Sequence, residues 1–136
     1  MGLELTRIEE PFVFELKNEE GVICGIDASP AIGGKAKGLR PMELLAGSLA
    51  GCASIDVLLI LKKQRIEPTH FAIRIETRRS AGVPAVFEEI KLIFEVDNEV
   101  NKEKLEKAIA LTLEKYCSVS ASLKENIDVN FEIEFK

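Results

Sequence analysis

Hydrophobic and polar residues alternate along the first thirty positions, as in strands with one buried face. The alternation covers residues 3–8 and 12–16, and after the turn residues KNEEG it returns over 22–28. A period of two residues predicts three short strands, the last two forming a hairpin. The next stretch, SPAIGGKAKGLRP, is rich in Gly, Lys and Pro, so we expect a mobile loop.

The pattern then predicts a helix from about Pro41 to Gln64, which is apolar on nearly every face from Leu44 to Leu61. Pro41 suits the first turn of a helix, because the N–H that proline lacks would have no partner there. Glu43 in the same turn complements the helix dipole. A helix that is apolar all round must be covered all round. A single sheet covers one side, so a second sheet or a second subunit must cover the other. This predicts a homodimer.

The second half of the chain repeats these patterns. Alternating residues around 71–75 and 90–96 flank the turn SAGVP and predict a second hairpin. A helix is expected from Asn101, a suitable N-cap, to Tyr116.

Four residues form one stripe on that helix at helical spacing, and they are Leu105, Ile109, Thr112 and Tyr116. The helical pattern breaks near Cys117, and a last alternating strand covers 127–135. The order βββ-α-ββ-α-β indicates one α+β domain over residues 1–136 rather than a parallel doubly wound sheet.

Composition narrows the classes of function. The net charge is −5 and the chain has no basic run, so nucleic acid and anionic membranes are poor partners. Residues 44–61 are long enough to span a bilayer, but Ser48, Ser54 and Asp56 in that stretch argue against a membrane helix. The first residues are acidic where a signal peptide needs a basic start, so we expect a mature cytoplasmic protein.

Candidate chemistry rests on cysteine. The chain has three, Cys24, Cys52 and Cys117, with one histidine and no Cys-x-x-Cys pair. This argues against a disulfide framework and against a zinc site, and no cofactor is expected. Cys24 alternates in register with apolar neighbours, as a core residue does.

Two interpretations of Cys52 and Cys117 stay open on the residues alone. Free cysteines are often small core hydrophobes. A reactive thiol needs a nearby cation or helix N-terminus, and Asp56, one turn after Cys52, would oppose a thiolate if it were ionised and close. Arg40 or Lys37 could compensate only if the preceding loop folds over the site. Small residues around Cys52 leave room for a ligand or for the close packing of another backbone.

Two stretches together resemble the OsmC/Ohr family of osmotically induced and organic hydroperoxide resistance proteins. They are GLRPMELLAGSLAGCASIDVLLILKK and, much later, KYCSVSASL. The resemblance lies in the Pro-x-Glu-Leu-Leu helix start, the Gly-Cys in mid-helix and the Cys-x-Val-Ser after the second helix. It implies antiparallel sheets wrapped around a central buried helix in an intertwined homodimer.

The resemblance also implies a reaction. Cys52 would be the peroxidatic thiol that attacks an organic hydroperoxide or hydrogen peroxide, and Cys117 would resolve it as a disulfide. A small dithiol or a redox protein would reduce that disulfide, without a metal or an organic cofactor. Glu43, Arg40 and Asp56 are the candidate supporting residues.

The sequence departs from the family at the activating pair. The family places a glutamate directly after the helix proline, where this chain has Met42, with Glu43 one position later. The family's arginine comes from the N-terminal strands, which offer only Arg7. The alternative function is therefore a non-catalytic dimer that binds a small molecule or lipid. A structural dimer whose cysteines merely pack is the third reading.

Overall fold

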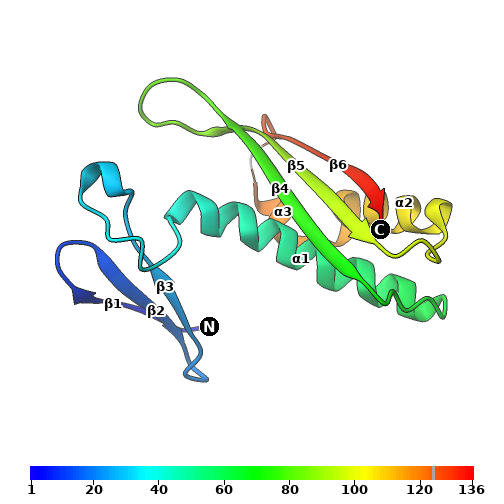
Figure 1. The fold of residues 1–136 in the computed structure, drawn as a ribbon, viewed down its shortest axis with the longest axis horizontal. Coiled ribbons are helices and arrows are strands. Elements are labelled where there is room, and N and C mark those ends of the chain that lie inside the picture. The colour runs from blue at the N-terminus through cyan, green and yellow to red at the C-terminus, as the bar shows by residue number, and fades with distance from the viewer. Residues whose placement is uncertain (124) are drawn as a thin grey trace. The chain divides into compact units, whose positions relative to one another are not determined.

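The structure, a computed structural model, describes residues 1–123 and 125–136. Its strands and helices, in chain order, are β1 (Leu3–Glu9), β2 (Val13–Asn18), β3 (Ile23–Ile26), the 3-10 turn η1 (Pro30–Ile32), α1 (Pro41–Lys63), β4 (Phe71–Arg79), β5 (Phe87–Val96), α2 (Lys102–Leu111), the π-helical turn η2 (Thr112–Tyr116), α3 (Ser118–Ser122) and β6 (Asp128–Phe135) (Figure 1). The predicted order βββ-α-ββ-α-β is confirmed. The chain packs as two compact units, Met1–Leu45 and Ala46–Lys136, so the single domain stays a prediction.

The first unit is the predicted three-stranded antiparallel sheet, in the order β1-β2-β3. Val13 is its most buried apolar residue, at 3% exposure. Strand β3 is shorter than the predicted 22–28. It ends at Ile26 because the next residue, Asp27, turns its carboxylate to the backbone of the following loop.

That loop is fastened rather than unsupported, which corrects the expected mobile segment. The Asp27 carboxylate, 2% exposed as a residue, accepts hydrogen bonds from the backbone N–H groups of Ala28 (2.7 Å), Lys35 (2.9 Å) and Lys37 (3.2 Å). The ammonium groups of Lys35 and Lys37 pair with Glu9 at 2.6 and 2.7 Å. The N–H of Lys35, ahead of the others, holds the pKa of Asp27 below its usual value although burial opposes this.

Helix α1 ends one residue before the predicted Gln64, and only one of its faces is buried in the single chain. The buried residues recur at helical spacing and are Ala46, Leu49, Ala50, Ala53, Val57 and Leu61. On the opposite face Ile55 is 63% exposed and Leu59 is 53% exposed. By length and composition α1 could cross a membrane, but its buried stripe makes it a partly buried core helix.

The second unit contains a mixed sheet in the order β4-β5-β6, visible as neighbouring green, yellow-green and red strands in Figure 1. The predicted hairpin of β4 and β5 is antiparallel, with Ile73 opposite Phe94. The expectation of antiparallel sheets is corrected at β6, which runs parallel to β5 with Phe94 opposite Ile133. The helical segment between the two strands crosses over the sheet, and such a crossover returns the chain in the same direction.

The two faces of this sheet differ sharply. On β5 the side chains of Ile90, Leu92, Phe94 and Val96 share one face, and each is fully buried. They form the core together with the buried stripe of α1 and with Leu105 and Ile109 of α2. The opposite face carries ion pairs, in which Arg74 bonds Glu95 at 2.6 Å and Glu134 at 2.9 Å.

The second helix starts as predicted, with the Asn101 side chain accepting a hydrogen bond from the Lys104 N–H at 3.0 Å. It does not continue regularly to Tyr116. The α-helix ends at Leu111 and a π turn follows, which shifts the later residues around the axis. Tyr116 is consequently 57% exposed, whereas Leu105, Ile109 and Thr112 of the expected stripe are fully buried.

The Asp27 hydrogen bonds predict an acid-sensitive first unit. Because the pKa of Asp27 is lowered in the folded state, its stabilisation is complete above the ordinary Asp value of about 3.9 and is lost as pH falls through the lowered value. We expect Asp27→Asn to lower the midpoint of thermal unfolding at neutral pH, measured by circular dichroism. The acid limb, which is the fall of this midpoint as pH is lowered, should be shallower in the variant than in the wild type. Asp128→Asn, which removes an exposed carboxylate, is the control. An unchanged acid limb in Asp27→Asn would contradict this role.

Candidate functional site

Cys52 lies in the middle of α1, at the border between its buried and exposed faces. At about 100° per residue, its position falls beside the exposed stripe of Ile55 and Leu59 and next to the buried stripe that includes Leu49. The residue is accordingly half-buried. Gly47 and Gly51 lie on the exposed side. Apart from the two neighbouring residues in the chain and the nearby backbone of the helix, a Cβ added at either glycine would meet no described atom within 4 Å.

Cys117 follows the π turn and is 2% exposed. Its backbone N–H donates to the carbonyl of Thr112 at 2.8 Å, five residues back, which closes the turn. Its side chain then begins the next helix. Cys117 is the N-cap of α3, and its Sγ accepts a hydrogen bond from the Ser120 N–H at 3.3 Å. The thiol therefore occupies the place that a serine or aspartate usually takes.

The two cysteines meet, although 65 positions separate them in the chain (117 − 52). Both thiols are free. Burial above all, together with the hydrogen bond and charge of the adjacent Cys52, raises the pKa of Cys117 to about 11, against the backbone N–H groups of Ser120 and Val119, which lower it. At neutral pH Cys117 is therefore a protonated thiol beside Cys52. A pair in contact can be linked as a disulfide.

The supporting residues named from the sequence lie at different places along the chain. Asp56 is half-buried on α1, one turn after Cys52. Glu43 and Arg40 belong to the first unit, where the Glu43 carboxylate accepts the backbone N–H of Arg40 at 2.9 Å at the start of α1. That bond satisfies an N–H at the helix start that lacks an intrahelical partner, in the manner of a capping box. A catalytic role for these three residues stays a prediction.

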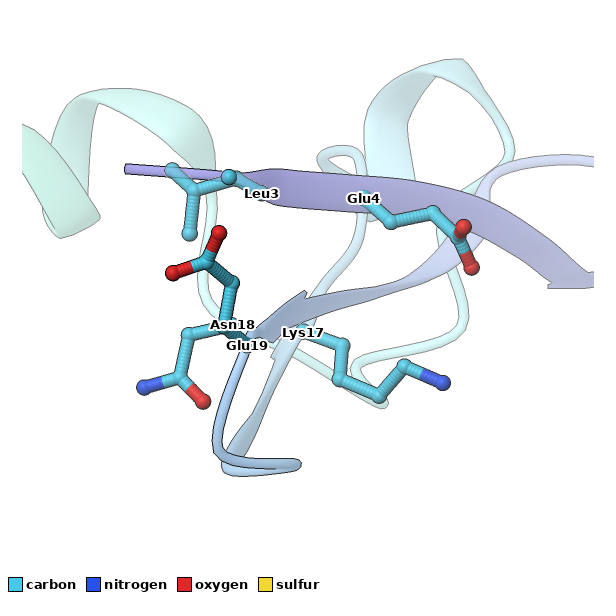
Figure 2. A pocket seen from close by; sticks show the side chains of 6 residues that line it. Leu3, Glu4, Lys17, Asn18 and Glu19 are labelled. Carbon is cyan, nitrogen blue, oxygen red and sulfur yellow. The ribbon is translucent and has the colours of Figure 1, made fainter.

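Elsewhere the described residues offer little chemistry. None of the His, Cys, Asp and Glu side chains among them gather in a group of three that could hold a metal ion. A hollow at the start of β1 and the end of β2 is lined by Gly2, Leu3, Glu4, Lys17, Asn18 and Glu19 (Figure 2). Its charged side chains are exposed, and the Asn18 Oδ1 already accepts two backbone N–H groups of the adjacent turn.

Sequence reasoning did not connect two residues with Cys117. Ser120 donates its N–H to the Cys117 sulfur and its hydroxyl to the carbonyl of Leu113 at 3.2 Å. Thr112, fully buried, supplies the carbonyl that closes the π turn. The spacing of Cys117 and Ser120, an N-cap with its N3 residue, was the available signal for the first of these.

The environment of Cys117 predicts a slow reaction with alkylating reagents. In a Cys24→Ser/Cys52→Ser variant, burial still holds the pKa of Cys117 above the ordinary thiol value of about 8.5, although the raising effect of Cys52 is gone. We expect iodoacetamide to modify Cys117 more slowly than a peptide thiol at neutral pH, with the rate rising into the alkaline range. Mass spectrometry measures the product. A rate at neutral pH equal to that of the urea-unfolded chain would contradict the burial of this thiol.

Comparisons with known proteins agree with this architecture. Over 99 residues, 72% of this chain and 74% of the relative, the sequence is 31% identical to protein YhfA of Escherichia coli K12. The crystal structure of a hypothetical protein from Aquifex aeolicus VF5 superposes with a TM-score of 0.80 at 33% identity, covering 99% of this chain and 96% of that one.

A third similar structure carries a functional name. The organic hydroperoxide resistance protein OhrB of Bacillus subtilis has a TM-score of 0.69 at 20% identity, covering 98% of each chain, and this likeness concerns the fold alone. A family model, described as OsmC-like protein, matches residues 34–132, which contain both Cys52 and Cys117. By the extent of that match, the chain belongs to the OsmC-like protein family.

Proposed function

We propose that this protein is a thiol-dependent peroxidase that uses Cys52 as the attacking thiol and Cys117 as the resolving thiol. The observation that carries the proposal is the contact between the two thiols, which come from α1 and from the cap of α3. The OsmC-like family includes proteins named for organic hydroperoxide resistance, and this supports peroxides, organic ones or hydrogen peroxide, as the substrate class.

The unequal surroundings of the two thiols support this order of events. Cys52 is half-buried at the border of the exposed face of α1, so a small molecule from solution can reach it. Cys117 is 2% exposed, and its pKa near 11 keeps it protonated at neutral pH. A peroxide from solution therefore meets Cys52 first.

The reaction then follows ordinary sulfur chemistry. The Cys52 thiolate attacks one peroxide oxygen, the O–O bond breaks, and the leaving alkoxide takes a proton to become an alcohol. The resulting sulfenic acid condenses with the Cys117 thiol, which forms the disulfide and releases water. A dithiol returns the pair to its reduced state by two exchange steps and itself becomes a disulfide. We infer a cytoplasmic setting, where such dithiols keep protein thiols reduced.

A peroxide assay tests the proposal. With dithiothreitol as reductant, we expect the wild type to consume tert-butyl hydroperoxide or hydrogen peroxide, and Cys52→Ser to fall to the rate of buffer alone because the nucleophile is lost. Cys24→Ser is the matched control. Cys24 lies on β3 in the first unit, and its loss should leave the rate unchanged.

The proposed role of Cys117 as the resolving thiol is tested separately. Cys117→Ser should form a sulfenic acid at Cys52 that a dimedone-type reagent traps, but no disulfide. Equal peroxide consumption by wild type and Cys52→Ser would refute the peroxidase. Together with an absence of disulfide after peroxide treatment, it would favour a binding protein.

We also propose that the protein is a homodimer that covers the exposed face of α1. Ile55 and Leu59 are 63% and 53% exposed on a helix whose other face lies in the core. Apolar patches of this kind mark interfaces between proteins. The open flank at Gly47 and Gly51 allows another backbone to approach closely.

Light scattering tests the dimer. We expect twice the chain mass for the wild type at micromolar concentration and a single chain for Leu59→Glu, because a charge at the centre of an apolar interface loses its hydration. Ala81→Glu, which adds the same charge to the exposed turn between β4 and β5, should remain dimeric. A monomeric wild type would refute the proposal.

A further inference from the structure

Two features of the backbone, the π turn and the start of α3, fix the position of Cys117. The π turn of Thr112–Tyr116 ends with the Cys117 N–H bonded to the Thr112 carbonyl, and α3 begins at once with Cys117 as its cap. The Cys117 carbonyl accepts the Ala121 N–H at 3.0 Å, so the residue is fixed on both sides of its Cα. Only the side-chain torsion remains to be set, and this torsion decides whether the sulfur faces Cys52.

Ser120 sets that torsion with two hydrogen bonds. Its N–H donates to the Cys117 sulfur at 3.3 Å, and its hydroxyl donates to the Leu113 carbonyl at 3.2 Å. The second bond runs back over the π turn and ties the first turn of α3 to it. The N–H that holds the sulfur is thus itself held in place.

We propose that Ser120 is a positioning residue for thiol–disulfide exchange between Cys52 and Cys117, with its N–H on the Cys117 sulfur and its hydroxyl anchoring that N–H to the π turn. Each exchange step passes through a thiolate, which Cys117 forms either when it attacks or when it leaves. An N–H donor aimed at the sulfur stabilises that charge, and its effect on the pKa of Cys117 opposes that of burial. The inference rests on the proposed function for its biological use, but not for its test.

The exchange can be measured without peroxide. In a Cys24→Ser background, glutathione disulfide reacts with the Cys52 thiolate to give a mixed disulfide and one glutathione. Cys117 then attacks the Cys52 sulfur, closes the ring and releases the second glutathione. The pair loses two electrons and two protons, and glutathione disulfide gains them. Acid quenching and mass spectrometry separate the mixed disulfide from the closed ring and give the rate of ring closure.

Three variants at two serines test the role of the anchor. Ser120→Ala keeps the backbone N–H but removes the hydroxyl that anchors it to the Leu113 carbonyl. The loss of that one hydrogen bond corresponds to ring closure that is about three- to tenfold slower at neutral pH. The rate–pH profile should move to higher pH, because the Cys117 thiolate is less stabilised. Ser120→Thr, which keeps the hydroxyl, should restore both readouts. Ser122→Ala removes a hydroxyl that bonds the Ser118 carbonyl at 2.8 Å on the same helix, and should behave as wild type.

The outcomes are separable. Alanine is a better helix former than serine, so Ser120→Ala should fold, and urea unfolding verifies this. Ring closure at the wild-type rate with an unmoved pH profile in Ser120→Ala overturns the proposal, and so does a Ser120→Thr variant that is as slow as Ser120→Ala. Ring closure that depends on Ser120 in a protein without peroxide consumption supports the positioning role and rejects only the peroxidase.

Discussion

The burial of one stripe of α1 in the core of the second unit is the constraint on which the site depends. Leu49, Ala53 and Val57 are fully buried, in the same unit as the fully buried face of β5. This packing fixes the rotation of the helix about its axis. Because the rotation is fixed, Cys52 is held at the border of the stripe, where it contacts Cys117 on one side and lies next to the exposed Ile55 and Leu59 on the other. A rotation by one residue, about 100°, would bury or expose the thiol and break the contact.

Two opposed effects act on the pKa of the Cys117 thiol. Burial removes the water that would solvate a thiolate, whereas the N–H groups at the start of α3 solvate it from one direction. The outcome is a thiol that stays protonated at rest and yet has a donor placed to receive its charge. A surface thiol would ionise more readily but would also meet oxidants directly. The arrangement fits a residue that reacts with a neighbour rather than with solvent.

Local patterns predicted much of the fold, because hydrophobic periodicity is a local signal. The bounds of α1 to within one residue, the Asn101 cap and the alternation that ends at Phe135 all follow from it. The direction of β6 did not, because alternation is the same in a parallel and an antiparallel strand. The sequence did not predict the π turn either. Thr112 and Tyr116 keep helical spacing in the sequence, although the inserted residue turns Tyr116 outward.

The candidate site, like the fold, was predictable from the sequence only in part. The residues alone left Cys52 and Cys117 open between core packing and chemistry, and only the resemblance paired them. Their contact depends on long-range packing that no local pattern encodes. Asp27 was overlooked for a related reason, since its hydrogen-bond partners lie up to ten residues away in a loop without periodicity.

The contact between the two thiols has a consequence for the order of the proposed reaction. The hydrogen bond and charge of Cys52 are among the causes that raise the pKa of Cys117. Once Cys52 has become a neutral sulfenic acid, its negative charge is gone, while the N–H of Ser120 still points at the Cys117 sulfur. Cys117 therefore ionises more easily after Cys52 is oxidised than before. Oxidation of Cys52 would thus favour the ionisation of the resolving thiol, because the charge of Cys52 is part of the electrostatic environment of Cys117.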